Sequence, residues 1–156
     1  MSAVGSRIIL LVEDDPADAR LIQRAFTKAG IVDPIVRLTN GDDAVAYIDG
    51  QPPYDKRAIH PIPTLVILDI KLPRRTGLEV LKWLRSRSDG LRRLPVLMLT
   101  SSRHLVDVNR AYDYGANSYL TKPDTSEQLL TMAQAIRTYW LTLNELPTLE
   151  GAASGG

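Results

Sequence analysis

Five short apolar runs, separated by segments of helical periodicity, constrain the fold of this chain more than any other feature. The runs occupy residues 8–12, 35–38, 65–68, 96–99 and, more weakly, 118–120. Each is brief, aliphatic or β-branched, and nearly continuous rather than alternating, as expected for strands that are buried on both faces of a parallel sheet. The pattern predicts an α/β fold, with a doubly wound five-stranded parallel sheet and helices on both faces.

The segments between the runs carry signals that begin and end helices. Asp15 can cap a helix that has Pro16 at its first position and Asp18 in its first turn. An apolar stripe follows and ends at Gly30; it consists of Leu21, Ile22, Ala25, Phe26 and Ala29. Further helices are predicted at 43–48, 77–86, 105–114 and 126–143, which makes five strand–helix units.

Two segments depart from this alternation. Residues 50–63 contain four prolines and are too long for an ordinary connection between a helix and a strand, so we predict an inserted surface loop. The end of the chain is rich in Gly, Ala and Ser. We therefore predict one domain over 7–147 and a disordered tail over 148–156.

The composition narrows the classes of function. A chain of 156 residues with 44% hydrophobic and 24% charged residues can build one packed core. Its net charge of +1 gives no bulk attraction for nucleic acid or an anionic membrane. With no cysteine and two histidines, any metal would be held by oxygen. No apolar stretch could span a bilayer and no signal segment is visible, so we expect a cytoplasmic protein.

Polar residues follow four of the five predicted strands. In strand order they are Glu13-Asp14-Asp15, Asp69, Thr100-Ser101-Ser102 and Thr121-Lys122-Pro123. The carboxyl ends of parallel strands meet at one edge of a sheet, so these groups are expected in one crevice. Taken alone, the three acids after the first strand could equally cap a helix; the combination indicates a site.

Crowded carboxylates repel one another unless a cation neutralises them. Mg²⁺ suits this need because it prefers oxygen ligands. It would mask the charge of Asp69, and with Lys122 it would let that carboxylate act as a nucleophile toward a phosphoryl group.

Four motifs in this order resemble the receiver domains of two-component response regulators, over about residues 7–143. They lie at 11–15 (LVEDD), 68–73 (LDIKLP, with Gly77 following), 99–102 (LTSS) and 119–123 (YLTKP). The resemblance implies the flavodoxin-like receiver fold. It implies that Asp69 is the phosphoacceptor and that Glu13 and Asp14 are the acidic pair that binds Mg²⁺, Asp14 more directly. The backbone carbonyl of Lys71 would be a further metal ligand.

The same resemblance implies roles for the ends of the last two strands. Thr100 matches the switch hydroxyl, Ser101 the small residue beside the pocket, and Lys122 the lysine that contacts the phosphoryl group. Pro123 would follow a cis peptide bond. Tyr119 matches the switch aromatic that turns inward with Thr100, although a half-buried strand tyrosine would fit the sequence equally.

The function implied is that of a phosphoacceptor switch rather than an enzyme with a separate substrate. A sensor histidine kinase would donate a phosphoryl group to Asp69, and the chain would catalyse this transfer and a slow dephosphorylation. Within the family, the insert, the Glu13-Asp14-Asp15-Pro16 opening and residues 139–147 look most like the small regulators paired with phytochromes. Lys71 and Ser102 occupy positions that vary among members and flank the route of hydrolytic water, so the lifetime of the phosphorylated state is not transferable.

The last predicted helix is more apolar than one buried face requires. A stripe consists of Leu129, Met132, Ala133, Ile136, Trp140 and Leu143, and further apolar residues lie off it: Leu130, Tyr139, Leu141 and Leu146. A homodimer through this region, a docked partner, or the tail folded onto its own domain would each cover this surface.

Two other classes share part of this pattern. A Mg²⁺-dependent phosphohydrolase with an aspartyl nucleophile would resemble Asp-x-Asp after its first strand, whereas here Lys71 takes the second acid's place and the acceptor follows the third strand. A flavin-binding electron carrier would need a phosphate-cradling loop after the first strand, where the three acids would repel a phosphate.

Overall fold

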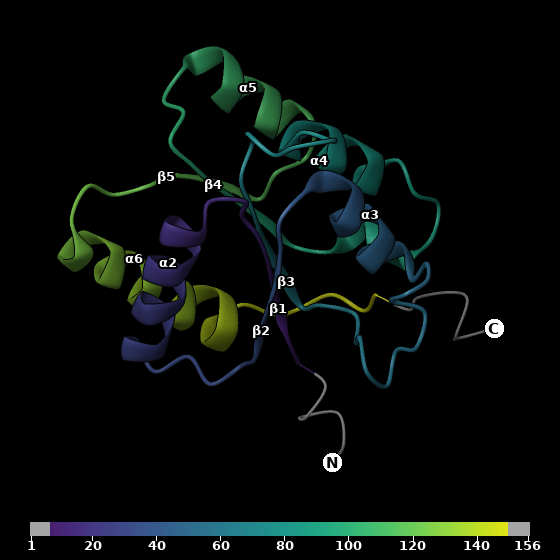
Figure 1. The fold of residues 1–156 in the computed structure, drawn as a ribbon, viewed down its shortest axis with the longest axis horizontal. Coiled ribbons are helices and arrows are strands. Elements are labelled where there is room, and N and C mark those ends of the chain that lie inside the picture. Colours follow the sequence, from purple (N-terminus) through teal and green to yellow (C-terminus); the bar gives the residue numbers. More distant parts are fainter. Residues whose placement is uncertain (1–6, 150–156) are drawn as a thin grey trace.

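The computed structural model describes residues 7–149 and contains a five-stranded, fully parallel sheet (Figure 1). The strands are β1 (Ile9–Val12), β2 (Ile35–Leu38), β3 (Leu65–Leu68), β4 (Val96–Thr100) and β5 (Ser118–Thr121). Their order is β2-β1-β3-β4-β5, and Ile9 pairs with Ile35 on one side and Leu65 on the other. The predicted fold class is therefore confirmed, with strand bounds within one residue of those predicted.

Five α-helices connect and follow the strands. They are α2 (Pro16–Lys28), α3 (Gly41–Asp49), α4 (Gly77–Arg85), α5 (Leu105–Asp113) and α6 (Ser126–Thr138). A 3-10 turn, η1 (Gly90–Arg93), precedes β4. Side chains cap several of these helices: Asp15 accepts from the backbone N–H of Ala17 at 2.8 Å, and Thr76 and Glu79 form a reciprocal capping box on α4.

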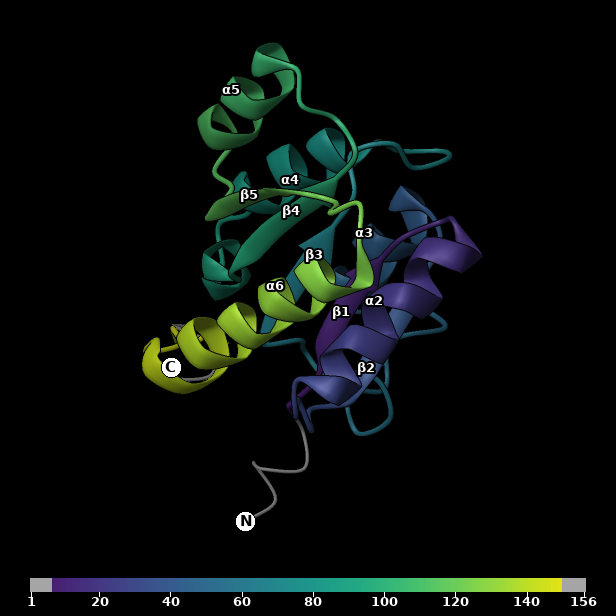
Figure 2. The same cartoon turned by 90° about the vertical axis from the view of Figure 1, so that its left-hand side faces the viewer.

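The helices form two layers around the sheet. Figures 1 and 2 show α2 and α6 on one face and α3, α4 and α5 on the other. Successive strand residues point to opposite faces, so Ile9 and Leu11 join the core beneath α2 and α6, while Leu10 and Val12 join the core beneath α3 and α4. The central strands β1, β3 and β4 are buried throughout, which explains why their runs are continuously apolar, whereas the edge strands β2 and β5 are partly exposed.

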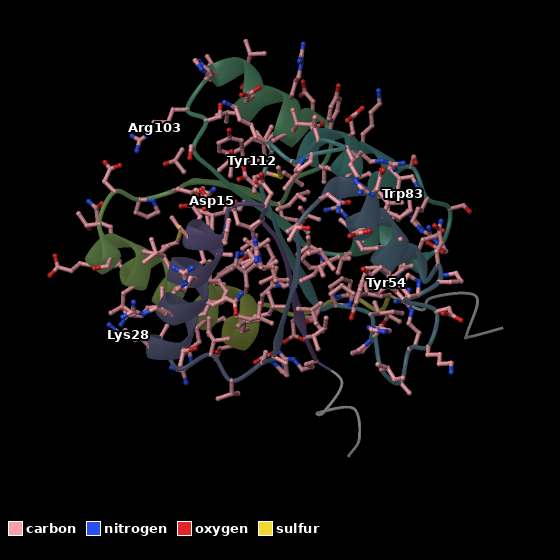
Figure 3. The ribbon with its side chains drawn as sticks, in the orientation of Figure 1. Asp15, Lys28, Tyr54, Trp83, Arg103 and Tyr112 are labelled. Atoms are coloured by element: carbon pink, nitrogen blue, oxygen red, sulfur yellow. The ribbon has the colours of Figure 1, made fainter. Side chains whose placement is uncertain are left out.

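The insert at 50–63 is fastened to the end of α3. The Arg57 guanidinium donates to the carbonyls of Tyr47 at 2.8 Å and Ile48 at 2.7 Å in the last turn of that helix. Tyr54, visible beside α3 in Figure 3, stacks against Tyr47 with ring centroids 5.1 Å apart. The insert precedes β3, so it lies at the amino end of that strand.

The C-terminal region differs from the single long helix predicted. Helix α6 ends at Thr138 and continues as a π-helical segment, η2 (Tyr139–Leu143). Trp140 and Leu141 pack against the core beneath α2 and α6, as do Leu130 and Met132. Leu143, predicted to face the sheet, is 68% exposed, because the wider η2 turn rotates it off the α6 stripe.

Two other sequence predictions are wrong in detail. Leu21 is 47% exposed, because the buried face of α2 is carried by residues 22, 25, 26 and 29 and Leu21 lies at its edge. The cis peptide bond among the described residues joins Pro52 to Pro53, and the Lys122–Pro123 bond is trans, the geometry that most X-Pro bonds adopt.

The predicted tail falls largely outside the described part of the chain. Of residues 148–156, Thr148 accepts a hydrogen bond from Arg93 and Leu149 packs against the core beneath α3 and α4. Residues 150–156 lie outside the described residues. Among residues 7–149, no helix is both long and apolar enough to cross a membrane.

Candidate functional site

The site lies where the chain leaves β1 and β3 at their carboxyl ends. Strand β1 has β2 as its neighbour on one edge and β3 on the other. The connections from β1 to β2 and from β2 to β3 therefore run in opposite directions across the sheet, which leaves a crevice at the carboxyl ends of β1 and β3. Asp69 directly follows β3 and is 6% exposed, and its backbone N–H donates to the carbonyl of Val12 at 3.2 Å. This bond ties the end of β3 to the end of β1.

Close packing of α4 fixes the other side of Asp69. Gly77, the first residue of α4, donates its N–H to the carbonyl of Ile70 at 2.8 Å. A Cβ at position 77 would collide with the backbone carbonyl of Asp69. Only glycine fits this approach, so the helix start and the strand end are held in contact. Lys71, in the loop between them, is exposed.

Three carboxylates converge at the site. Glu13, Asp14 and Asp69 each offer one oxygen, and these oxygens lie within 4.8 Å of one another. Glu13 is 1% exposed and Asp14 is exposed. Arg37 of β2 donates to the backbone carbonyls of Glu13 at 3.0 Å and Asp14 at 3.1 Å, which holds the loop after β1 in place. An all-oxygen donor set of this kind suits a hard divalent cation such as Mg²⁺.

Lys122 brings a positive charge to these carboxylates from the end of β5. Its Nζ lies 2.7 Å from Glu13, 2.8 Å from Asp18 and 2.9 Å from Asp69. Burial would lower the pKa of Lys122, but the hydrogen bonds to Asp18, Glu13 and Asp69 outweigh it and raise that pKa. Lys122 is therefore fully charged at neutral pH.

Glu13 experiences the opposite balance. Burial raises the pKa of its carboxyl, whereas the hydrogen bond from Lys122 and that from the N–H of Asp15 lower it. The nearby charge of Asp69 raises it again, and the net pKa lies above the ordinary value of 4.5. A further cation at this site would therefore stabilise the ionised form of Glu13.

The end of β4 supplies a buried hydroxyl. Thr100 is 1% exposed and its hydroxyl accepts a long hydrogen bond of 3.5 Å from the N–H of Ser102. The Ser102 hydroxyl donates to Asp107 of α5, and the Tyr119 hydroxyl donates to the Ser102 carbonyl at 2.9 Å. Tyr119 is half-buried against the core, and burial raises its pKa. The loop after Thr100 is thus tied to both α5 and β5, while neighbouring Ser101 is exposed.

Sequence reasoning placed Glu13, Asp14, Asp69 and Lys122 together, as the structure does, and missed Asp18. Asp18 was expected only as a first-turn acid of α2, yet its carboxylate binds Lys122. Side chains of a helix tilt toward its amino end, and this end of α2, where Figure 3 labels Asp15, adjoins the carboxyl end of β1. An acid in that turn therefore points back toward the strand ends. The position of Asp18 in the first turn was the sequence signal that could have identified it.

Comparison with known proteins decides the family. The chain matches the sequence model of the response regulator receiver domain over residues 9–134. It belongs to this family. A receiver domain is a signalling switch, and that description now applies to this chain.

Individual relatives match nearly the whole of this receiver domain. It is 38% identical to the response regulator Rcp1 of Synechocystis sp. over 90% of its own length and 93% of that protein. It is 41% identical to the probable methanogenesis regulatory protein FilR2 of Methanothrix harundinacea, over 90% and 87%. A Mn²⁺-bound form of Rcp1 superimposes with a TM-score of 0.81 at 37% identity, covering 90% of this chain and 99% of the other.

A second similar structure is that of the phosphorylated cyanobacterial phytochrome response regulator RcpA. It matches with a TM-score of 0.83 at 34% identity, covering 91% of this chain and 98% of the other. The receiver domain is therefore close in sequence and fold to regulators associated with phytochromes.

Proposed function

We propose that this receiver domain accepts a phosphoryl group on Asp69 from a sensor histidine kinase in a Mg²⁺-dependent reaction, and that it signals by a change of conformation. One observation carries the proposal: the Asp69 carboxylate lies between two acids that can hold a cation and the ammonium of Lys122. With a divalent cation bound, that cation and Lys122 would offset the negative charge of these acids, so that Asp69 could approach an anionic phosphoryl donor.

The metal would be held by Glu13, Asp14 and Asp69, with the backbone carbonyl of Lys71 as a further ligand. When bound, Mg²⁺ supplies positive charge that masks the carboxylates and stabilises the oxygens of a transferring phosphoryl group. The oxygen-only donor set and the raised pKa of Glu13 support this assignment. The Mn²⁺-bound form of the similar protein Rcp1 supports a divalent cation.

The chain's own residues would carry out the transfer. A carboxylate oxygen of Asp69 would attack phosphorus in line, and the bond between phosphorus and the kinase histidine would break, leaving its electron pair on the histidine nitrogen. Lys122, whose ammonium donates to Asp69, would turn an ammonium hydrogen toward the transferring oxygens, and Asp69 stays fixed by its backbone bond to Val12. The domain thus catalyses its own phosphorylation and, with water as the acceptor, a slow dephosphorylation.

Thr100 would be the residue whose movement responds to phosphorylation of Asp69. A phosphoryl group adds about two negative charges and three acceptor oxygens, which attract the Thr100 hydroxyl. Its movement would shift the loop that Tyr119 and Asp107 hold. Because that loop leads into α5 and is tied to β5, we propose that α5, β5 and α6 form the output face.

The relatives support a proposal for the partner and its setting. RcpA is described as a phytochrome response regulator, and we propose that a phytochrome kinase in the cytoplasm is the donor for this chain. The balanced charge of the chain favours recognition of a protein over nucleic acid or a membrane.

A homodimer through the C-terminal region is a second part of the proposal. Tyr139 is 52% exposed and Leu143 is 68% exposed, at the two ends of η2. Two such segments facing each other would cover these side chains. Since Trp140 belongs to the core, the sharp test is Leu143→Glu rather than truncation: sedimentation should show a loss of dimer, and an unchanged assembly would reject this part.

Intact mass spectrometry tests the central claim. The protein is incubated with a small phosphodonor and Mg²⁺, alongside Asp69→Asn and the control Asp124→Asn, which removes an exposed acid of the β5–α6 loop. The wild type and the control should gain one phosphoryl group, and Asp69→Asn should gain none. A wild type without added mass, or an Asp69→Asn variant with as much, would reject phosphorylation at Asp69.

A further inference from the structure

The Lys122 ammonium contacts three carboxylates, and these carboxylates differ in one respect. Glu13 and Asp69 belong to the group that can hold a metal. Asp18 does not, although its oxygen lies only 2.8 Å from Nζ. Asp18 is therefore the one carboxylate bound to Lys122, within residues 7–149, that a metal at the site would leave to the lysine.

We propose that Asp18 is a positioning residue that keeps the Lys122 ammonium at the pocket when the cation and the phosphoryl group engage Glu13 and Asp69. The inference rests on the proposed function, because it concerns the same lysine. It assigns to the first turn of α2 a task beyond covering the sheet.

The charges explain why such an anchor is needed. A divalent cation that takes the oxygens of Glu13 and Asp69 removes two partners of Lys122 and repels its ammonium. A lysine has a flexible four-carbon stem, so without another anion the ammonium would turn toward water. Asp18 supplies that anion within hydrogen-bond distance of Nζ, and it does not belong to the group that can hold the metal.

Both ends of the Asp18–Lys122 contact are fixed by backbone structure. The start of α2 is held by the Asp15 cap, which accepts from the N–H groups of Ala17 and Asp18. The N–H of Lys122 donates to the carbonyl of Thr100 at 2.9 Å. The backbone therefore holds both residues in place, and only the side chains of Asp18 and Lys122 have to span the gap between them. This distinguishes the contact from a chance pair of surface side chains.

A purely structural role for Asp18 predicts something different. An acid in the first turn interacts favourably with the positive end of the helix. That effect would stabilise α2 whether or not Lys122 is present. A double-mutant cycle between Asp18 and Lys122 therefore separates the two roles.

The first experiment measures Mg²⁺ affinity by calorimetry for wild type, Asp18→Asn, Lys122→Met and the double variant. Without Asp18, the remaining partners of Lys122 are both metal ligands, so Mg²⁺ must displace the ammonium with no carboxylate to receive it. We expect Asp18→Asn to weaken Mg²⁺ binding about three- to tenfold in the presence of Lys122, and by less than about twofold in the Lys122→Met background. Asp18→Glu should retain most of the affinity, and the control Asp124→Asn should match wild type.

A second readout follows the lysine itself. In the presence of Mg²⁺, the ¹⁵N-labelled ammonium of Lys122 should give a protected resonance in wild type and in Asp18→Glu. It should be lost to exchange with water in Asp18→Asn. The rate of phosphorylation by a small phosphodonor should fall in parallel, about three- to tenfold.

Each result decides the matter. If Asp18→Asn lowers the affinity equally with and without the Lys122→Met change, Asp18 serves the helix alone and the proposal is overturned. Unchanged affinity and an unchanged ammonium resonance in Asp18→Asn would overturn it as well. Should Asp18→Asn fail to fold by circular dichroism, Asp18→Ser replaces it in the same cycle. If the wild type accepts no phosphoryl group, the proposed function fails, while the affinity cycle still decides the role of Asp18.

Discussion

The carboxylate of Glu13, almost fully buried, lies 2.7 Å from the ammonium of Lys122, the residue that directly follows β5. Replacing Lys122 by Met leaves Glu13 and Asp69 side by side without a cation, and removing one partner of a buried pair costs about 3–5 kcal/mol. We expect Lys122→Met to lower the free energy of unfolding by roughly 3 kcal/mol in metal-free buffer. Urea unfolding checks this.

Added Mg²⁺ should then stabilise Lys122→Met more than wild type, because the cation takes over the neutralising role. Thermal unfolding with and without Mg²⁺ measures the difference. An identical shift for both proteins would contradict the assigned competition between lysine and metal.

Substitution of Gly77 tests the packing of α4 against Asp69. A methyl group at position 77 meets the Asp69 carbonyl, so the strand end or the helix start must move. Gly77→Ala should cost about 2 kcal/mol or more and should reduce phosphorylation of Asp69. Gly30→Ala is the comparison: its methyl group would make only ordinary van der Waals contacts, but its φ is 85°, so it should cost about 1 kcal/mol and leave phosphorylation unchanged. Similar phosphorylation of both variants would argue against the packing role.

Arg87 forms ion pairs with Asp49 and Asp89, which predict that the free energy of unfolding depends on pH. Hydrogen bonds from Arg87 lower the pKa of both carboxyl groups below the ordinary 3.8. The folded state therefore binds fewer protons than the unfolded state, and the stabilisation is present above about pH 3.8 and lost as the pH falls through the lower folded pKa values. Because the side chains are partly exposed, we expect these ion pairs to contribute about 1 kcal/mol or less to the free energy of unfolding.

Urea unfolding of Arg87→Gln and wild type at about pH 7 and near pH 3 measures this effect. The difference between the two proteins should narrow at the lower pH, leaving a constant part from the contact of Arg87 with Trp83. A difference that stays the same at both pH values would mean that these ion pairs contribute nothing.

Tyr119→Phe isolates one hydroxyl at the output face. It removes the donor to the Ser102 carbonyl, with an expected cost of about 1 kcal/mol. Hydrogen exchange should quicken in residues 101–104, while Asp69 should still accept a phosphoryl group, because the Tyr119 hydroxyl bonds to Ser102 instead. Slower exchange, or a loss of phosphorylation, would show that Tyr119 acts elsewhere.

The sequence predicted β1, β3 and β4 well because burial on both faces leaves a continuous apolar signal, and the partly exposed edge strands β2 and β5 gave a weaker one. It also predicted the meeting of Glu13, Asp14, Asp69 and Lys122, because parallel topology places all strand ends at one edge. These inferences needed only the order of elements, without any knowledge of side-chain conformation.

What the sequence did not show depends on side-chain reach or on local helix geometry. The bond from Asp18 to Lys122 joins residues 104 positions apart, and nothing in their spacing states that the two side chains meet. The change from α6 to η2 moved Leu143 outward because a wider turn alters the periodicity. The insert was recognised by its prolines, but its attachment through Arg57 follows from contacts alone.

That attachment has a practical consequence. The insert joins the end of α3 to the beginning of β3, so it lies at the end of the sheet away from Asp69. Pro52, Pro53 and Asp55 at its outer part are exposed, while Arg57 keeps its base fixed. A dye or an immobilisation tag introduced at this point would leave the chemistry at the far end undisturbed, which would allow single molecules to be followed through repeated cycles of phosphorylation.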